Sequence, residues 1–286
     1  MSNLSRSGPE LVSGAPFCGA IRAEQEAFFR EEQPNTGVAF LVPISDKTGR
    51  PFDLATEKFG LGQAMYGGQI GVNVEVSYHR QVGLDFTIRQ LGNTGMVHGV
   101  ILGEPVPYAH GRDQLRSAIP AHKDIDGVNP SSPFFRRRPT PSAMVHIAQQ
   151  VWGNLSAAKT AVVGSRGAIG SALVCQLEDL GSRPVGIDVH NVGDLHSAVR
   201  EADVVFTAAR SARIITPEML TGLSNLVIDA AIVPTEEGIV GNVDPRAYED
   251  SRIHSSITPV PGGVGMLNRA MVFENLRSAI GTAQAA

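Results

Sequence analysis

The sequence predicts an α/β protein whose second half contains a doubly wound parallel sheet. Two patterns indicate this fold class. In the first half, short apolar strands alternate with helical segments, as expected for parallel strands joined by crossover helices. From Lys159 onward the alternation becomes a regular strand–helix–strand series, which is typical of a Rossmann-like nucleotide-binding domain.

The first half is expected to form an α/β lobe. An amphipathic helical run covers about residues 19–32, and the strand-like segment GVAFLVPI follows it. The glycine-rich segment FDLATEKFGLGQAMYGGQIG, residues 52–71, reads as a helix, and the strand-like GVNVEVSYH comes directly after it. A polar–apolar run near residues 83–92 and the apolar segment MVHGVILGEPVP complete the lobe.

A proline-rich strip, VNPSSPFFRRRPTPSAM, leads into the second half. The helix that follows is expected to have Thr140 as its N-cap and Pro141 in its first turn, and to end near Trp152. The strands of the second half are predicted at KTAVVGS, PVGIDV, DVVFTAA and NLVIDAAI, and its helices at residues 168–180 and 192–201.

A last helix, at about residues 264–283, is expected to pack back on the first lobe, because a doubly wound domain already has its crossover helices. The predicted division is therefore a lobe of residues 1–150 completed by 264–286, and a nucleotide-binding domain of residues 151–263. The C-terminal helix would thus belong to the lobe that begins the chain.

Composition restricts the classes of partner. The 286 residues are 42% hydrophobic and 18% charged, with a formal net charge of −4, which excludes a disordered tail protein and gives no electrostatic reason to expect nucleic acid. No apolar run approaches the roughly 18 residues that cross a bilayer, and MSNLSRSGPELVSG lacks the apolar core of a signal peptide. A cytoplasmic protein with a small-molecule partner is expected, with no membrane association. No Cys or His cluster has metal-ligand spacing, so no metal is expected.

Three glycines predict a phosphate-binding turn. The segment VVGSRGAIGSAL places them between a strand and a helix, where a pyrophosphate can bind at the helix N-terminus. The spacing is not G-x-G-x-x-G, because Arg166 stands where the second glycine belongs, and an ordinary tight turn explains the motif nearly as well. The strand–helix–strand context favours a dinucleotide site. The residues expected to contact the cofactor there are Gly164, Ser165, Arg166, Gly167, Ile169 and Gly170.

Asp188 bears on the choice between NAD and NADP. It ends the next predicted strand, where a carboxylate can accept hydrogen bonds from the adenosine ribose and repel the extra phosphate of NADP. Asp188 therefore favours NAD. Three nearby side chains, Arg166, Arg183 and His190, could reverse this preference, and Asp188 could instead cap its own turn.

Three further segments carry a resemblance to a known family. AIPAHKDIDGVNP, RPTPSA and SITPVPGGVGMLNRAMVFEN resemble, in order and spacing, segments of the methylenetetrahydrofolate dehydrogenase/cyclohydrolase (FolD) family that read approximately KDVDG, PCTP and TPVPGGVGPMT. The similarity extends over about residues 11–283. The resemblance implies that 5,10-methylenetetrahydrofolate is oxidised to the methenyl form with NAD or NADP and then hydrolysed to the formyl form. It also implies a folate-binding catalytic lobe and a homodimer formed through the nucleotide-binding domain.

The resemblance gives two segments a role in folate binding. Asp126, in KDIDG, would anchor the pterin, since a carboxylate can accept two hydrogen bonds from an aminopyrimidine edge; the alternative is an aspartate that stabilises a turn. In PVPGGVG, residues Pro261, Gly262 and Gly263 would bring backbone close to a flat ligand; the alternative is an ordinary loop-to-helix junction.

The catalytic helix departs from the family pattern. Relatives carry a tyrosine and, four residues later, a lysine that lies about eight residues before a Gly-Ile or Gly-Val pair. Counting back from the Gly-Val pair at residues 71–72 puts Gln63 at the lysine position and Phe59 at the tyrosine position. A register through Gly67 would instead put Lys58 within one residue of the catalytic place. The first register is preferred because the following strand then continues without a gap.

Two other positions also depart from the pattern. The family segment V-Q-L-P-L-P corresponds to LGEPVP, so Gly103 stands where a glutamine would support the lysine, and Glu104 stands beside it. The glycine that usually follows the third strand of the nucleotide-binding domain aligns near Arg210. This arginine would either contact a cofactor phosphate or obstruct the nicotinamide position.

The expected function is an NAD(P)-dependent methylenetetrahydrofolate dehydrogenase with little or no cyclohydrolase activity. A carboxamide at residue 63 can orient the ligand for hydride transfer but cannot move the protons that hydrolysis requires. One alternative is a bifunctional enzyme that uses Lys58. The other is a non-catalytic folate- or nucleotide-binding paralogue.

Overall fold

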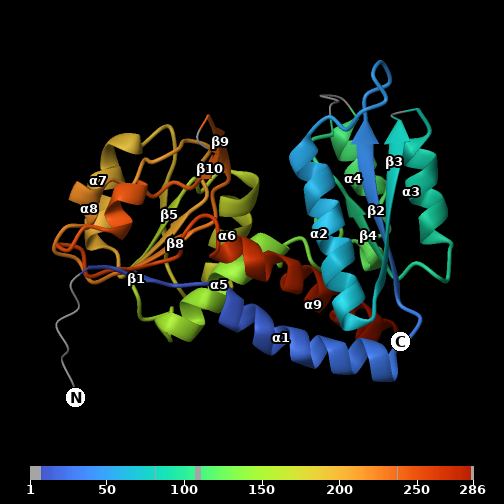
Figure 1. Ribbon diagram of the computed structural model, residues 1–286, viewed down its shortest axis with the longest axis horizontal. Coiled ribbons are helices and arrows are strands. Elements are labelled where there is room, and N and C mark those ends of the chain that lie inside the picture. The colour runs from blue at the N-terminus through green and yellow to red at the C-terminus, as the bar shows by residue number, and fades with distance from the viewer. Residues whose placement is uncertain (1–7, 81, 107–110, 237, 285–286) are drawn as a thin grey trace. The chain divides into compact units, whose positions relative to one another are not determined.

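The computed structural model divides into two compact units (Figure 1). One comprises Met1–Cys18 and Thr140–Asn268, and the other comprises Gly19–Pro139 and Arg269–Ala286. We call them the six-stranded unit and the three-stranded unit after their main sheets. The structure describes residues 8–80, 82–106, 111–236 and 238–284. Which unit binds which ligand stays a prediction.

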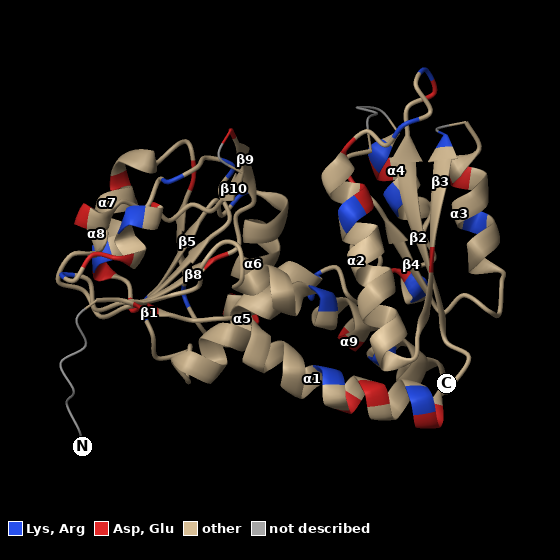
Figure 2. Cartoon of the chain, in the orientation of Figure 1, with Lys and Arg blue, Asp and Glu red and all other residues tan. Residues whose placement is uncertain are grey.

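The six-stranded unit is built on one parallel sheet with strand order β1-β11-β8-β7-β5-β6. Its strands are β1 (Glu10–Leu11), β5 (Thr160–Val163), β6 (Val185–Ile187), β7 (Val204–Thr207), β8 (Leu226–Asp229) and β11 (Ser256–Ile257). The strands β5, β7 and β8 are buried along their whole length, as expected of a parallel sheet covered on both faces. Charged residues are drawn mainly on the helices and loops in Figure 2.

Helices cover both faces of this sheet. They are α5 (Pro139–Val151), α6 (Ala168–Asp179), α7 (Leu195–Glu201) and α8 (Pro217–Leu220), with 3-10 turns at Val192–Asp194 and Pro245–Tyr248. Figure 1 shows α7 and α8 on one side of the strands and α6 on the other, so the predicted doubly wound fold is confirmed. An antiparallel ribbon of β9 (Val233–Thr235) and β10 (Gly238–Val240) follows β8.

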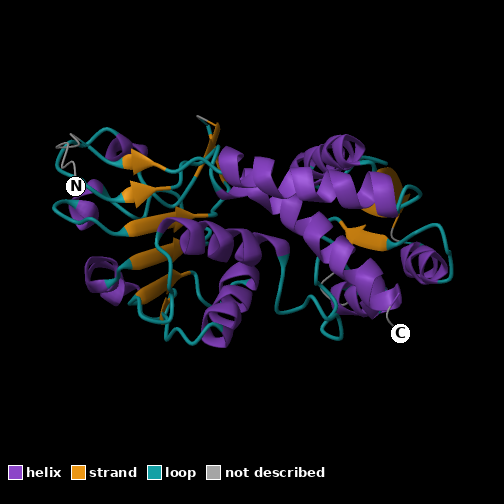
Figure 3. Ribbon diagram, turned by 90° about the horizontal axis from the view of Figure 1, so that it is seen from below, coloured by secondary structure: helices purple, strands orange, loops and turns teal. Residues whose placement is uncertain are grey.

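The three-stranded unit has a parallel sheet with order β3-β2-β4. Its elements are α1 (Ala15–Ala27, which enters from the other unit), a π-helical turn (Phe28–Glu32), β2 (Gly37–Ile44), α2 (Leu54–Ile70), β3 (Asn73–Arg80), α3 (Leu84–Gly92), β4 (Gly99–Leu102), α4 (Arg112–Ala118), a 3-10 turn (Ala121–Lys123) and most of α9 (Val264–Gln284). One core cluster joins apolar side chains of α3 and α4 to one face of β2 and β4. Figure 3 distinguishes the helices from the strands of each unit by colour.

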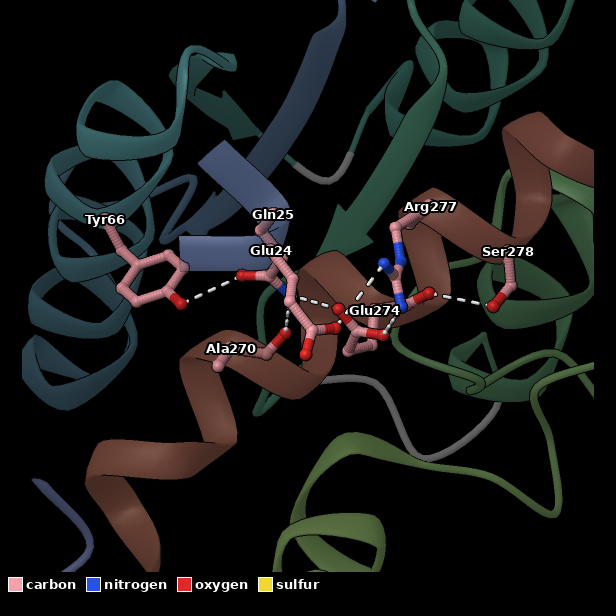
Figure 4. Close-up of polar contacts among 7 residues, drawn as sticks. All are labelled: Glu24, Gln25, Tyr66, Ala270, Glu274, Arg277 and Ser278. Atoms are coloured by element: carbon pink, nitrogen blue, oxygen red, sulfur yellow. Dashed lines mark hydrogen bonds and ion pairs between the residues drawn. The ribbon is translucent and has the colours of Figure 1, made fainter. Parts of the chain in front are cut away.

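Helices α1, α2 and α9 meet at one buried side chain, Gln25 (Figure 4). Its amide nitrogen donates to the Ala270 carbonyl oxygen and to a Glu274 carboxylate oxygen, both at 2.8 Å. Its amide oxygen accepts the Tyr66 hydroxyl at 2.8 Å. Arg277 in turn pairs with Glu274 at 2.9 Å. Every polar atom of the Gln25 side chain is therefore used to join the three helices.

Several boundaries differ from the sequence-based expectation. Helix α5 begins at Pro139, so Thr140 lies in its first turn and accepts a hydrogen bond from Asn268 instead of capping the helix. The fixed φ of proline suits the first helical position, which accounts for the earlier start. The apolar segment MVHGVILGEPVP contributes a strand of only four residues, Gly99–Leu102. Strand β1 has no counterpart among the predicted elements. None of the described helices is long and apolar enough to span a bilayer.

Candidate functional site

Helix α2 holds the residues for which catalytic roles are expected. It starts at the N-cap Asp53, whose carboxylate accepts the Ala55 amide at 2.8 Å, and it ends at Gly71 in the left-handed conformation, φ 87°. The Gly-Val pair used for the register thus coincides with the end of the helix.

The glycines of α2 allow close packing inside the three-stranded unit. A Cβ at Gly60 would stand 2.8 Å from the Phe40 ring, and one at Gly62 would stand 2.9 Å from the Arg269 guanidinium. A Cβ at Gly67 would stand 2.6 Å from Val74. Contacts under 3.0 Å are essentially never seen for real Cβ atoms, so a side chain at Gly60 or Gly67 would push α2 away from β2 or β3, whereas at Gly62 the flexible Arg269 side chain could move aside.

Gln63 lies on the same buried side of α2, with no exposed surface. Neither its amide nitrogen nor its amide oxygen has a hydrogen-bond partner among the described residues. An unpaired buried polar group costs about 1–3 kcal/mol, so native structures seldom retain one without a purpose. Gln63 is therefore a strong candidate for a group that meets a ligand.

Phe59 and Lys58 differ from Gln63 in their surroundings. The Phe59 ring packs edge-to-face on Phe40, with ring centroids 5.9 Å apart. Lys58 is exposed. Five residues along an α-helix correspond to about 140° of rotation, so Lys58 projects away from the side that buries Gln63. The structure does not bring Lys58 and Gln63 together.

Gly103 and Glu104 follow β4 and contact the first turns of α2. A Cβ at Gly103 would stand 2.5 Å from the Thr56 methyl group and 2.9 Å from the Leu41 carbonyl oxygen, so no side chain fits there. The Thr56 hydroxyl donates to the Glu104 carbonyl oxygen. The Glu104 carboxylate accepts the Arg116 Nε–H of α4 at 2.6 Å. These bonds tie the segment after β4 to both α2 and α4.

The two aspartates of KDIDG have different environments. Asp124 is fully buried and stabilises the turn, since its carboxylate accepts the Asn129 amide at 2.7 Å and its carbonyl oxygen accepts the Ser132 hydroxyl at 3.1 Å. Asp126 makes no hydrogen bond to any residue that the structure describes. The turn-stabilising role considered for Asp126 is thus carried by Asp124.

The environment of Asp126 raises the pKa of its carboxyl group to about 7. Removal of the carboxyl group from water is the largest cause, although the residue as a whole keeps some exposed surface. The nearby carboxylates of Asp124 and Glu104 raise the pKa further, while Arg138 and Arg116 oppose the rise. Near neutral pH this carboxyl group is divided between its two protonation states.

The proline–glycine loop, Pro259–Gly263, belongs to the six-stranded unit and leads into α9. Its ends are joined by a hydrogen bond from the Gly263 amide to the Pro259 carbonyl oxygen, 2.8 Å. Gly262 has φ 109°, which favours glycine, and a Cβ at Gly263 would stand 2.8 Å from Thr258. Pro261, at the tip of the loop, is exposed.

The predicted phosphate loop forms the turn from β5 to α6. Gly164 has φ 87°, and a Cβ there would stand 2.9 Å from the Ala208 backbone. A Cβ at Gly170 would overlap the Gly164 carbonyl oxygen, so this glycine lets the helix pack against the turn. Ser165 and Ile169 are partly buried on either side of the N-cap Gly167. A glycine cradle at a helix N-terminus fits the pyrophosphate of a dinucleotide.

Asp188 follows β6 and has several partners. Its carboxylate accepts the His190 amide at 2.8 Å, and the Arg166 Nε lies 2.9 Å from its other oxygen. The Asp188 amide donates to Asn191 at 2.7 Å. Asp188 therefore caps its own turn and also forms an ion pair with the arginine of the phosphate loop. The Arg166 side chain is 72% exposed and can leave this pair at little cost.

Arg210 is exposed on the loop after β7. The shape of this loop depends on Asn242, a residue that the sequence patterns did not identify. The fully buried Asn242 accepts the Ala209 amide at 2.8 Å and donates to the Ser211 carbonyl oxygen at 2.6 Å. Arg213 has φ 57°, the one positive φ among described residues other than glycine. Thr56 and Arg116 were missed in the same way, because their partners are distant in sequence and no local pattern marks them.

Comparisons with known proteins agree with the fold and with the family resemblance in the sequence. The family model for the tetrahydrofolate dehydrogenase/cyclohydrolase NAD(P)-binding domain matches residues 138–284. The chain is 32% identical over 203 residues to Bifunctional protein FolD 1 of Rhodococcus jostii, which covers 68% of this chain and 67% of that protein. It is 28% identical over 277 residues to Bifunctional protein FolD of Rhodopseudomonas palustris, which covers 92% of each.

A solved structure extends the likeness to nearly the whole fold. The N5,N10-methylenetetrahydrofolate dehydrogenase-cyclohydrolase of Trypanosoma brucei, complexed with NADP and an inhibitor, has a TM-score of 0.82 at 20% identity and covers 97% of this chain and 99% of its own. At that identity the likeness shows the fold alone. The family model over half of the chain and the Rhodococcus relative show more: the chain belongs to the tetrahydrofolate dehydrogenase/cyclohydrolase (FolD) family.

Proposed function

We propose that this protein is an NAD(P)-dependent 5,10-methylenetetrahydrofolate dehydrogenase with weak or absent methenyltetrahydrofolate cyclohydrolase activity. One observation carries the proposal. Gln63, a neutral amide that the preferred register aligns with the family's catalytic lysine, is buried without a hydrogen-bond partner among the described residues. The site has therefore kept a polar group that can contact a ligand and has lost the group that titrates.

The two reactions make different demands on this position. When bound, the nicotinamide accepts the hydride, and the lone pairs of the folate nitrogens stabilise the resulting cation, so the protein mainly has to orient the ligand. An amide can do this by hydrogen bonding. Hydrolysis of the methenyl cation needs an activated water molecule and proton transfer, and a carboxamide does not titrate in the accessible pH range. Dehydrogenation should persist where hydrolysis fails.

The surroundings of Gly103 support the proposed loss of cyclohydrolase activity. In relatives a glutamine supports the lysine from this position, but here the Thr56 methyl group and the Leu41 carbonyl oxygen fill the space that a side chain would need. The Thr56 hydroxyl also fixes the Glu104 backbone. We infer that restoring a lysine at residue 63 would restore little hydrolysis, because its supporting partner cannot be accommodated.

Asp126 is proposed to anchor the pterin. Its carboxylate has no hydrogen-bond partner among the described residues, so both oxygens can accept hydrogen bonds from an aminopyrimidine edge. Within the six-stranded unit, the backbone of Pro261, Gly262 and Gly263 is proposed as a substrate contact, since glycine allows close approach. We propose residues 1–150 with 264–286 as the folate-binding catalytic domain, and residues 151–263 as the NAD(P)-binding domain.

NAD is the proposed cofactor. Asp188 provides the carboxylate for the adenosine ribose, and the glycine cradle of residues 164–170 receives the pyrophosphate. The ion pair with Arg166 partly neutralises Asp188 and so weakens its preference against the extra phosphate of NADP. Arg210 is proposed to contact a cofactor phosphate from its loop after β7.

We further propose a cytoplasmic homodimer that forms through the six-stranded unit. Strand β6 lies at one edge of the sheet, so no strand of the described residues neighbours one side of its backbone. Three valines near this edge are strongly exposed: Val185 at 56%, Val189 at 85% and Val192 at 60%. An apolar group next to an unpaired strand fits a second copy of the chain.

A spectrophotometric assay tests the proposed function. With methylenetetrahydrofolate and NAD or NADP, methenyltetrahydrofolate should accumulate and decay no faster than it does without enzyme. Rapid catalysed decay would contradict the monofunctional proposal, and its loss in Lys58→Ala would then identify the bifunctional alternative. Tight folate binding without cofactor turnover would instead indicate a non-catalytic paralogue. The proposal expects dehydrogenase turnover that Lys58→Ala leaves unchanged.

A further inference from the structure

We propose that Gly14 is a positioning residue for the proline–glycine loop, and that the N-terminal strand acts as a brace that holds this loop in its ligand-binding shape. The inference rests on the proposed role of Pro259–Gly263 in ligand binding. It assigns a function to a segment of the chain that no motif or expected element had singled out.

The N-terminal segment runs beside the strand that leads into the loop. Strand β1 pairs in parallel with β11, and the backbone amides of alternate residues donate to the neighbouring segment. The Glu10 amide donates to the Ser255 carbonyl oxygen at 3.1 Å, and the Val12 amide donates to that of Ile257 at 2.8 Å. The ladder does not stop at the end of β11. The Gly14 amide donates to the Gly262 carbonyl oxygen at 3.0 Å, inside the loop itself.

Gly14 is buried and approaches the loop more closely than any other residue type could. A Cβ added at Gly14 would overlap the Gly263 carbonyl oxygen and would stand 3.4 Å from the Met266 Cβ. The obstacle is backbone, so no change of side-chain rotamer relieves the overlap. Any side chain at residue 14 must move either the N-terminal segment or the loop.

The loop cannot simply shift away from a side chain at residue 14. Gly263 is packed on its other side against Thr258, where the Cβ of an alanine would stand 2.8 Å away. The Thr258 hydroxyl is in turn fixed, because it accepts the backbone amide of the buried Asp229 at 2.7 Å. The Gly263 carbonyl oxygen also accepts the Met266 amide at 3.2 Å in the first turn of α9. A displaced Gly263 therefore changes the positions of Pro261 and Gly262.

A positioning role of Gly14 and a role in packing alone predict different effects of a substitution. If Gly14 serves packing alone, a substitution lowers stability and leaves ligand affinity unchanged in the molecules that remain folded. If Gly14 positions the loop, the folded variant binds its ligand more weakly. A displacement of about 1 Å at a positioning group can cost a factor of up to about 100 in catalysis.

The test compares Gly14→Ala with Gly19→Ala in the full-length protein. Gly19 lies five residues later and has no atom within 4 Å of an added Cβ, so it is the matched control. Hydrogen–deuterium exchange of the amides of residues 258–266 is measured without ligand, and KM for methylenetetrahydrofolate is measured in the dehydrogenase assay. Gly14→Ala should exchange faster in this segment and should raise KM about 10- to 100-fold, while Gly19→Ala should do neither.

Unchanged exchange and unchanged KM in folded Gly14→Ala would overturn the proposal. Faster exchange with unchanged KM would also overturn it, and would show that the failed part is the assigned ligand-binding role of the loop. If Gly14→Ala does not fold, Val12→Pro serves in its place, because proline removes the amide that donates to Ile257 without adding bulk at Gly263. The proposal then requires a smaller rise in the same two quantities.

Discussion

Two fully buried glutamines of the three-stranded unit have opposite environments. Gln25, where α1, α2 and α9 meet, makes three hydrogen bonds and joins the three helices. Gln63, further along α2, makes none to the described residues, although it is equally buried. The same unit can therefore satisfy a buried amide. The lack of partners for Gln63 is therefore a local property of the proposed site. Its amide can bind a ligand, whereas the Gln25 amide is already hydrogen-bonded within the protein.

Replacing Gln25 should have the largest effect on stability. Gln25→Leu removes the buried hydrogen bonds that Gln25 makes with the Tyr66 hydroxyl, the Ala270 carbonyl oxygen and the Glu274 carboxylate. We expect a loss of about 3 kcal/mol or more in the free energy of unfolding, measured by urea denaturation. The value of KM in the variant that remains folded should change little. A loss below about 1 kcal/mol would mean that solvent reaches this junction and replaces the bonds.

Replacing Gln63 should act in the opposite direction on stability. Gln63→Leu removes a buried amide that has no partner among the described residues, and we expect a gain of about 1–3 kcal/mol in the free energy of unfolding. The dehydrogenase kcat/KM should fall by about tenfold or more, because the ligand loses an orienting hydrogen bond. Equal destabilisation by Gln63→Leu and Gln25→Leu would show that Gln63 has a partner in solution and would remove the contrast between them.

Asp126, like Gln63, is a polar residue of the proposed site without a hydrogen-bond partner among the described residues, but it can carry a charge. The pKa of Asp126 is raised from 3.8 to about 7 in the folded protein. An unfolded chain therefore releases this proton at lower pH than the folded chain does. As a result, this group lowers stability progressively as pH rises from about 4 to about 7. Pterin binding requires the ionised form, so KM for folate should fall as pH rises through about 7.

Glu104→Gln should move this transition to lower pH. The substitution removes a carboxylate that raises the pKa of Asp126, and it releases Arg116, which lowers that pKa. The control is Asp113→Asn, since Asp113 also pairs with Arg116, at 3.8 Å, but its side chain is 92% exposed. The midpoint is read from the pH dependence of KM and, independently of turnover, from carbon NMR of the Asp126 carboxyl group. A midpoint that both variants shift equally would assign the effect to Arg116 alone.

The smallest effect on stability is expected at the exposed ion pair of the phosphate loop. Arg166→Ala should change the free energy of unfolding by less than about 1 kcal/mol, because the arginine is largely exposed. It should nevertheless lower kcat/KM for NADP relative to NAD, since Asp188 loses its neutralising partner. Asp188→Ser should raise the same ratio. If neither variant changes the ratio of kcat/KM values for the two cofactors, Asp188 only caps its turn.

Local sequence patterns predicted the parts of the molecule that depend on local chemistry. The turn from β5 to α6 was expected because a strand, spaced glycines and a helix follow one another within a few residues. The end of α2 at Gly71 matches the position from which Gln63 was assigned. In each case the residues that determine the structure are neighbours in the chain.

Features that depend on distant partners were not predictable in this way. Strand β1 has only two residues and no alternating pattern, and it forms because β11, more than 240 residues later, offers an edge. Asn242 shapes the loop at Ala209–Ser211 across more than 30 residues of sequence. The different roles of Asp124 and Asp126 also depend on how the turn folds, since both are acidic residues in the same short motif.

The four glycines among the 17 residues of α2 have a consequence for how the protein folds. Each glycine costs a helix about 1 kcal/mol relative to alanine, so an isolated α2 peptide should be mostly disordered in water. The helix can form only as Phe40, Val74 and Phe273 come into place against its glycines. We therefore expect α2 to be a late element of the folding reaction. The position of Gln63 is then determined by the neighbours that accept the helix more than by the preferences of the helix itself.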